Sequence, residues 1–413
     1  MSDLEASSGA TGRPYRVLMI APTSFFADYG CHVRILEEAR YLQSQGHEPA
    51  IVTYQNGRNL DGLTIFRTLP IPWRTDYEVG SSRHKIAFDA LLAVRSIQAM
   101  LGWRPDIIHA HLHEGALIGL ALSRLCGCPL VCDLQGSLTA EMLDHGFVRQ
   151  GSLAHRAFYR LERFINRAAP HILTSTQQTA RLLQERFGCA AERVTHVPDC
   201  VNTAVFAPAP RDDAWRARRA ALGIPPERLV VAYLGLLAEY QGTSHLLRAA
   251  AELCRRRDDL HFLIAGFPNM ERYRLEAESL GIGARCSFPG KVPYEQAPAL
   301  LALGDVAVSP KLSATEGAGK LLNYMALGLP TVAFDTPVSR EYLGEDGVYA
   351  AAGDSHALAD ALHALMEDAP LRQELAGRLR LRAQQRYAWS SSGELILQTY
   401  RAAQGDHRRK RAS

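Results

Sequence analysis

Lysine is scarce in this sequence of 413 residues. Of its 46 basic residues only five are lysine, and Lys291, Lys311 and Lys320 lie within thirty residues of one another. A lysine ammonium is a compact point charge that suits phosphate, whereas the planar fork of arginine requires a partner of defined geometry. The clustering therefore indicates that this part of the chain binds phosphate.

Three other scarcities exclude classes of protein. The formal net charge of +3 is too small to indicate a nucleic-acid partner. No uninterrupted apolar run approaches the length of a membrane span, and residues 1–13 lack the apolar segment of a signal peptide, so we expect them to form a disordered tail. The eight cysteines are scattered, and Cys126, Cys128 and Cys132 do not match the spacing of a common zinc site. A cytoplasmic protein with free thiols is expected.

Apolar segments of strand length alternate with helical patterns along the whole chain, which predicts α/β architecture with parallel sheets covered by helices. The length suits two domains. We predict a disordered tail (1–13), a first doubly wound, Rossmann-like domain (14–205), a second one (206–389), and a helix that crosses back to the first domain with a basic tail (390–413). The predicted strands are 16–21, 50–53, 64–67, 106–110, 130–133, 171–175, 193–197, 229–234, 261–265, 286–288, 305–308 and 331–334. Two such domains would enclose a cleft at the carboxyl ends of their strands.

A strand–loop–helix segment in the second half has the features of an anion site. Thr315 is placed to cap a helix whose predicted first turn contains Gly317 and Gly319, so little side chain would shield its free N–H groups. Lys320 would lie one turn in, and Gly328 with the following proline would end the helix. The alternative is an ordinary crossover in a parallel sheet.

These residues carry a resemblance to a known family. Glu316-Gly317-Ala318-Gly319, followed by Tyr324-Met325-Ala326-Leu327-Gly328-Leu329-Pro330, is similar to the donor-nucleotide motif of family 4 retaining glycosyltransferases, the glycosyl transferases group 1. Pro198-Asp199-Cys200-Val201-Asn202 is similar to the family's inter-domain junction. The resemblance implies the GT-B fold, two Rossmann-like domains with the substrates in the cleft between them.

The resemblance also implies a donor site for a nucleoside-diphosphate sugar. Three positions depart from the family's pattern: Leu236 and Gln241 replace an arginine and a lysine that neutralise the diphosphate, and Asn323 replaces a second glutamate. Lys311 and Lys320 could supply the missing positive charge. The implied donor-binding residues are Gly30, Gly235, Gln241, Gly290, Lys291, Val292, Lys311, Gly317, Ala318, Gly319, Lys320, Leu321 and Asn323.

The first half is expected to hold the acceptor and part of the catalytic site. The resemblance implies catalytic roles for Glu316, His111 and Gln135, the last in place of the family's usual histidine. Gln135 cannot act as a base, but in retaining chemistry of this class the leaving phosphate deprotonates the acceptor. The acceptor-side candidates are His113, Glu114, Asp133 and Ser137.

Three histidines at two-residue spacing, His109, His111 and His113, raise the question of a metal. Strand alternation places His109 and His111 on one face, so one of them could be a packed core histidine. Because no carboxylate cluster or pair of cysteines at ligand spacing lies nearby in the sequence, neither a metal site nor a cofactor is predicted.

The sequence thus predicts a retaining, metal-independent glycosyltransferase that moves a hexose from a nucleoside diphosphate to a hydroxyl of a glycan, lipid-linked or small-molecule acceptor. A non-catalytic glycan- or nucleotide-binding protein and a sugar-nucleotide epimerase-like enzyme of the same fold are the alternatives. The predicted location is cytoplasmic. Residues 147–168 form a basic amphipathic pattern that either packs on the sheet or contacts the inner face of a membrane.

Overall fold

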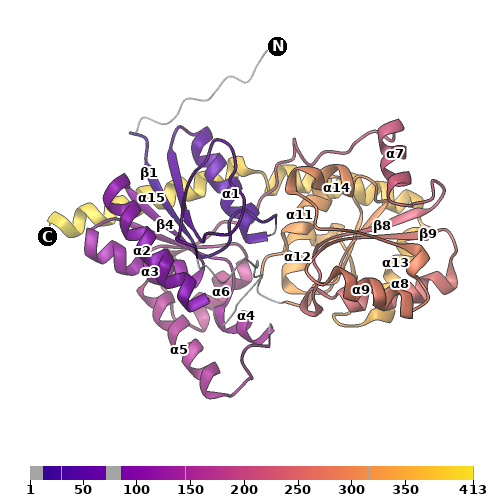
Figure 1. Ribbon diagram of the computed structural model, residues 1–413, viewed down its shortest axis with the longest axis horizontal. Helices are drawn as coiled ribbons and strands as arrows, with labels where there is room; N and C mark the ends of the chain where they lie inside the picture. Colours follow the sequence, from indigo (N-terminus) through magenta and orange to yellow (C-terminus); the bar gives the residue numbers. More distant parts are fainter. Residues whose placement is uncertain (1–12, 29, 71–84, 145, 314–315, 413) are drawn as a thin grey trace, which may run out of the picture.

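The structure is a computed structural model that describes residues 13–28, 30–70, 85–144, 146–313 and 316–412. The chain forms two lobes, each built on one parallel sheet with helices on both faces (Figure 1). The first lobe contains the sheet β1–β7 and the second the sheet β8–β13. The prediction of two Rossmann-like α/β domains is confirmed.

The seven-stranded sheet of the first lobe has the order β3-β2-β1-β4-β5-β6-β7. Its strands are β1 (Arg16–Ala21), β2 (Glu48–Thr53), β3 (Thr64–Arg67), β4 (Ile107–His111), β5 (Leu130–Leu134), β6 (Ile172–Thr174) and β7 (Val194–His196). The helices are α1 (Gly30–Ser44), α2 (Lys85–Trp103), α3 (Leu112–Cys126), α4 (Leu138–Asp144), α5 (Leu153–Ala168) and α6 (Gln177–Glu185). The order reverses between β1 and β4, and ligands of such sheets bind at this reversal.

The six-stranded sheet of the second lobe has the order β10-β9-β8-β11-β12-β13. Its strands are β8 (Leu229–Leu236), β9 (Leu260–Phe267), β10 (Cys286–Gly290), β11 (Val306–Ser309), β12 (Thr331–Phe334) and β13 (Val348–Ala350). The helices are α7 (Asp213–Ala221), α8 (Thr243–Arg256), α9 (Met270–Ser279), α10 (Ala297–Leu301), α11 (Gly319–Ala326), α12 (Pro337–Leu343), α13 (Ser355–Glu367) and α14 (Ala369–Arg386). Strand β13 was not among the predicted strands.

The last helix, α15 (Trp389–Ala412), runs from the second lobe back along the first (Figure 1). In the first lobe it packs on α1 and β5. Tyr400 of α15 is fully buried, and its hydroxyl lies 2.7 Å from Nδ1 of His109 in β4. The helix therefore supplies part of the first lobe's core.

Helix α2 bears on the expectation that no uninterrupted apolar run approaches the length of a membrane span. By length and composition it is the one helix among the described residues that is apolar enough to cross a membrane, and 22% of the relevant window is buried. Asp89 and Arg95 interrupt the apolar run in the sequence without making the helix polar as a whole. In the structure α2 packs against β1, β2, β3 and α3.

Candidate active site

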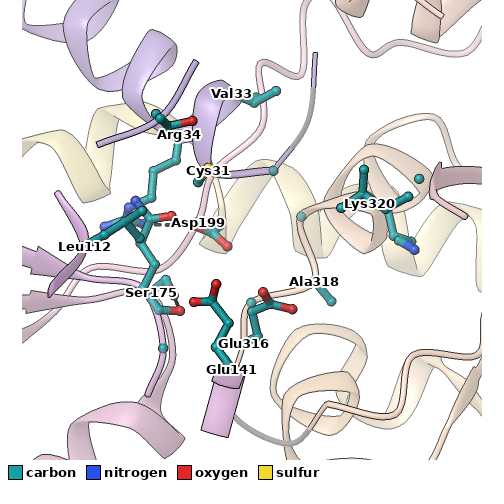
Figure 2. Close-up of a pocket in the computed structure, with 18 of the residues that line it drawn as sticks. Cys31, Val33, Arg34, Leu112, Glu141, Ser175, Asp199, Glu316, Ala318 and Lys320 are labelled. Carbon is teal, nitrogen blue, oxygen red and sulfur yellow. Dashed lines mark hydrogen bonds and ion pairs between the residues drawn. The ribbon is translucent and has the colours of Figure 1, made fainter. Parts of the chain in front are cut away.

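A large cleft lies between the two lobes, at the carboxyl ends of both sheets. Its walls come from the segments that follow β1, β4, β5 and β6 in the first lobe and β8, β9 and β11 in the second. Figure 2 shows Arg34 and Asp199 on one side, Lys320 on the other, and the carboxylates of Glu141 and Glu316 next to each other between them. The resemblance implied a substrate cleft in this place.

The loop before α11 lies on the floor of the cleft. The helix begins at Gly319, so Glu316 and Gly317 precede it instead of forming its first turn, while the predicted cap Thr315 lies outside the described residues. The reason is Lys311, a buried side chain whose Nζ donates to the carbonyl oxygens of Gly317 (2.7 Å) and Glu316 (3.2 Å). Those carbonyl groups are therefore held by a lysine rather than by helical N–H groups.

Lys311 also fixes the side chain of Glu316. Its Nζ lies 2.6 Å from Oε2 of Glu316, and only 6% of the lysine side chain is exposed against 42% of the glutamate. The ammonium is thus surrounded by oxygen atoms of its own loop. Lys311 orients the loop and the Glu316 carboxylate, and it is not the cation that would meet a diphosphate.

Lys320 is the cation in a position to contact a diphosphate in the cleft. Its Nζ donates to Oε1 of Gln241 (2.9 Å) and to the hydroxyl of Tyr233 (3.0 Å), and it lies 4.3 Å from the centre of the Tyr233 ring. No carboxylate forms an ion pair with it among the residues that the structure describes. Burial, and secondarily the charge of Lys311, hold the pKa of Lys320 well below its usual range. An anion beside this ammonium would reverse that shift.

Gly235 provides the space for this lysine. A Cβ atom at Gly235 would lie 2.7 Å from Nζ and 3.0 Å from Cε of Lys320. The glycine that the resemblance assigned to the donor site thus adjoins the ammonium at the end of β8.

The other predicted donor residues fall into two groups. Gly30, Gly235, Gln241, Val292, Lys311, Gly317, Ala318, Gly319, Lys320 and Asn323 line the cleft. Leu321 does not, because its side chain is fully buried in the core beneath α11. Gly290 and Lys291 lie outside the lining, and Nζ of Lys291 instead approaches Asp28 of the first lobe at 3.4 Å.

Of the residues predicted for the acceptor side and for catalysis in the first lobe, Gln135, His113, Glu114 and Ser137 line the cleft. The side-chain amide of Gln135 donates to Oδ2 of Asp133 at 3.0 Å, which fixes the orientation of its head group. Glu114 forms a 2.5 Å ion pair with Lys85 at the start of α2. That ion pair lowers the pKa of Glu114 against the opposing effect of burial.

His111 and Asp133 do not reach the cleft, which corrects two sequence predictions. Both side chains are fully buried, and Nδ1 of His111 lies 3.1 Å from Oδ2 of Asp133. Since alternate residues of a strand share a face, the ring of His111 stacks on that of His109, 4.4 Å between centroids, and points into the lobe. Neither side chain can touch an acceptor directly.

Arg34 of α1 was not predicted, although it organises this wall. Its guanidinium donates to both carboxylate oxygens of Asp133 (2.9 and 3.1 Å) and to Oδ1 of Asp199 (2.9 Å). Burial alone would lower the pKa of Arg34, but Asp133, Glu38 and Asp199 raise it above its usual range. The i,i+4 spacing of Arg34 and Glu38 on an otherwise buried helix face was the signal in the sequence.

Asp199 connects the wall to the second lobe. Its Oδ2 accepts a 3.0 Å hydrogen bond from the hydroxyl of Tyr342 in α12. A Cβ atom at Gly317 would lie 2.5 Å from the same oxygen, so the loop before α11 passes directly over it. The junction residue therefore meets the guanidinium of one lobe and the donor loop of the other.

The arrangement matches known protein families over most of the chain. Residues 29–200 match the model of the glycosyl transferase 4-like domain, and residues 216–382 match that of the glycosyl transferases group 1. The chain belongs to the glycosyl transferases group 1, with a family 4-like first domain, and is a glycosyltransferase.

Curated relatives and solved structures agree with this assignment. The chain is 29% identical to a D-inositol 3-phosphate glycosyltransferase of Acidothermus cellulolyticus, over 98% of this chain and 94% of that protein. It is 27% identical to a 2-deoxystreptamine N-acetyl-D-glucosaminyltransferase of Streptomyces fradiae, over 78% of each chain. Sucrose-phosphate synthase of Thermosynechococcus elongatus has the same fold, with a TM-score of 0.78 at 18% identity over 94% of this chain and 98% of that one.

Proposed function

We propose that this glycosyltransferase moves a hexose from a nucleoside diphosphate to a hydroxyl group of a carbohydrate, lipid-linked or small-molecule acceptor, with retention of anomeric configuration and without a metal at the diphosphate. The single observation that carries the proposal is the ammonium of Lys320, which faces the cleft beside Gln241 with no carboxylate partner among the described residues.

The donor is proposed to bind on the second lobe. Its diphosphate would lie between the amino end of α11 and Lys320, where free N–H groups and a cation replace the role of a divalent ion. Asn323, one turn further along α11, would hydrogen-bond the ribose through its amide. Glu316, anchored by Lys311, would accept hydrogen bonds from hydroxyl groups of the transferred sugar.

The chemistry is proposed to proceed on one face of the sugar. As the bond from the anomeric carbon to the diphosphate breaks, negative charge develops on the phosphate oxygen, and Lys320 and the α11 N–H groups stabilise it. The same phosphate takes the proton of the acceptor hydroxyl, so no side chain has to act as the base. Gln135, oriented by Asp133, would hold the acceptor by hydrogen bonding.

Thermal stability with nucleotides tests donor binding. UDP, GDP, ADP and dTDP are compared at equal concentration, each with and without magnesium. A ligand that binds only the folded state raises the unfolding temperature, and the rise is larger for the ligand with the lower dissociation constant. One effective nucleotide that acts equally with EDTA would support the proposal and identify the donor class. Binding without turnover on any acceptor would favour a non-catalytic binding protein of the same fold.

Product analysis tests the remaining points. Incubation with the matching hexose donor and either an inositol phosphate or 2-deoxystreptamine, the acceptors named by the two relatives, probes the acceptor class. Nuclear magnetic resonance of the product then reports the anomeric configuration. An inverted product would overturn the proposal of retention.

We also propose that the protein is cytoplasmic and contacts the inner face of a membrane through α5. This helix carries arginines at 156, 160, 163 and 167, while Leu153 is 82% and Phe164 is 51% exposed. Exposed apolar side chains beside basic ones suit an anionic lipid surface. Co-sedimentation with anionic but not neutral vesicles, lost in Phe164→Ser, would support this; equal binding by the variant would contradict it.

A further inference from the structure

A second polar cluster lies inside the first lobe. It consists of Glu38 from α1, His109 and His111 from β4, and Asp133 from β5, all with no exposed surface. One nitrogen or oxygen atom from each residue lies within 4.8 Å of those of the other three. The proposed transfer reaction does not use Glu38 or His109.

Both imidazole rings are oriented through Nδ1. Nδ1 of His109 lies 2.7 Å from the hydroxyl of Tyr400, and Nδ1 of His111 lies 3.1 Å from a carboxylate oxygen of Asp133. Because the Asp133 carboxylate only accepts, Nδ1 of His111 carries the proton and its lone pair is on Nε2. The Tyr400 hydroxyl is able to accept from Nδ1 of His109 in the same way, and that tautomer leaves the lone pair of His109 on Nε2. A hydrogen bond from Nδ1 to a carboxylate or other oxygen is the usual support of a metal-binding histidine.

The two Nε2 atoms converge on one carboxylate oxygen. They lie 3.8 Å (His109) and 3.9 Å (His111) from Oε2 of Glu38. All three atoms are buried and have no hydrogen-bond partner among the described residues. Buried polar atoms are normally paired, so the convergence of three such atoms requires an explanation.

The distances from the two Nε2 atoms to Oε2 of Glu38 fit ligands of one metal ion better than they fit a hydrogen bond. A hydrogen bond would bring nitrogen and oxygen to roughly 3 Å. Two ligands at about 2.1 Å from one zinc ion are roughly 3.4–3.6 Å apart at angles of about 110–120°. The observed separations lie closer to the second value, and a small rotation of Glu38 would close the remaining difference.

The charges around the cluster also favour a cation. Glu38, Asp133 and Asp199 are three carboxylates around the single guanidinium of Arg34. Arg34 lies 3.0 Å from Oε1 of Glu38, the oxygen that does not face the histidines, and so leaves Oε2 for another partner. A divalent ion beside Oε2 would be attracted by these carboxyl groups.

We propose that Oε2 of Glu38, Nε2 of His109 and Nε2 of His111 bind one divalent transition-metal ion, with zinc as the expected ion, and that Asp133 and Tyr400 orient the ligands. Two imidazoles and one carboxylate form a ligand set suited to zinc. The ion would join α1 to β4 and, through Tyr400, to α15. It would stabilise the first lobe and take no part at the donor diphosphate.

Metal analysis of the full-length chain, expressed without a polyhistidine tag, tests the site. We expect one zinc ion per chain by inductively coupled plasma mass spectrometry, retained through dialysis against EDTA because the site is fully buried. Glu38→Gln and His109→Gln should lose it. Tyr400→Phe should weaken zinc affinity by about 10–100-fold through loss of an orienting partner.

The matched control is His356→Ala. His356 belongs to the other described group of potential ligands, with Glu252 and Asp360, which is largely exposed. This variant should keep its zinc. Zinc lost from His356→Ala but kept in Glu38→Gln would overturn the proposal.

Refolding of the wild-type chain keeps the proposal testable if the variants do not fold. The denatured protein is refolded in metal-free buffer with or without one equivalent of cobalt(II). The proposed site predicts a visible cobalt absorption band and a higher unfolding temperature with the metal. A natively folded chain with no band and an unchanged unfolding temperature would overturn it.

Discussion

Nζ of Lys320 lies 2.9 Å from Oε1 of Gln241. The family resemblance places a diphosphate-binding lysine at position 241, and under the proposed function Lys320 of α11 supplies the positive charge that this position lacks. The amide accepts the hydrogen bond that holds Lys320 beside Tyr233 and Gly235. Under that proposal the departure from the family's pattern is a relocation of positive charge within one site.

Lys320→Met should weaken the binding of the effective nucleotide by roughly 10–100-fold, since a hydrogen bond to a charged group contributes about 1.5–3 kcal/mol. Titration calorimetry at pH 7 measures the loss. Arg272→Ala, which removes an exposed charge from the same lobe, is the control. Unchanged affinity in Lys320→Met would show that the lysine does not meet the diphosphate.

The lowered pKa of Lys320 predicts that nucleotide binding depends on pH. In the free protein its pKa is well below the ordinary 10.5, and a bound diphosphate would raise it. Binding then takes up a proton at any pH between the two pKa values, so nucleotide affinity should increase as the pH falls through that window. Affinity measured as a function of pH should show this slope in the wild type and lose it in Lys320→Met.

Gly235→Ala should reduce nucleotide affinity with little change in stability. The new methyl group would displace the flexible end of Lys320 and leave the backbone in place. Gly377→Ala in α14, where nothing lies within 4 Å of the added Cβ, is the control. It should leave binding unchanged and raise stability by up to about 1 kcal/mol. Full nucleotide affinity in Gly235→Ala would argue against the position assigned to the ammonium.

The sequence predicted the sheets well because apolar segments of strand length are visible without knowledge of their neighbours. Most of the residues predicted for the donor site line the cleft, where they are contiguous from Glu316 to Lys320. It failed where function depends on distant residues. The buried ring of His111 lies beside Glu38 and Asp133, and no pattern in the sequence indicates that these three side chains meet.

The start of α11 illustrates a second limit. The pattern of Thr315, Glu316 and two glycines is a good helix start by local rules. Lys311, six residues before Gly317, instead donates hydrogen bonds to the loop's carbonyl groups. A side chain from outside the helix decided its boundary, and local propensities contain no information about it.

Tyr342→Phe should destabilise the protein by about 1.5–3 kcal/mol, because the lost hydroxyl donates to the Asp199 carboxylate. Tyr387→Phe removes a hydroxyl that donates to the neutral carbonyl of Glu341 and should cost less, about 0.5–1.5 kcal/mol. Urea denaturation compares the two variants. An effect of Tyr342→Phe no larger than that of Tyr387→Phe would contradict the assigned interaction.

Asp89→Asn should change how stability depends on pH. Burial, and secondarily the charge of Glu114, raise the pKa of Asp89 from 3.8 to about 7. The folded state thus holds this proton more tightly than the unfolded chain does. The stabilisation that this proton gives the folded state is fully present below pH 3.8 and is lost as the pH rises to about 7. The asparagine still accepts a hydrogen bond from Tyr54. The variant should be more stable than the wild type at pH 8, whereas exposed Asp61→Asn should show no such gain.

Helix α15 has a consequence for the order of events during synthesis. The hydroxyl group that meets His109 belongs to Tyr400, so the core of the first lobe is completed by residues that leave the ribosome after the entire second lobe. Although the two lobes are separate in space, the core of the first lobe is therefore complete only after the second lobe has been synthesised.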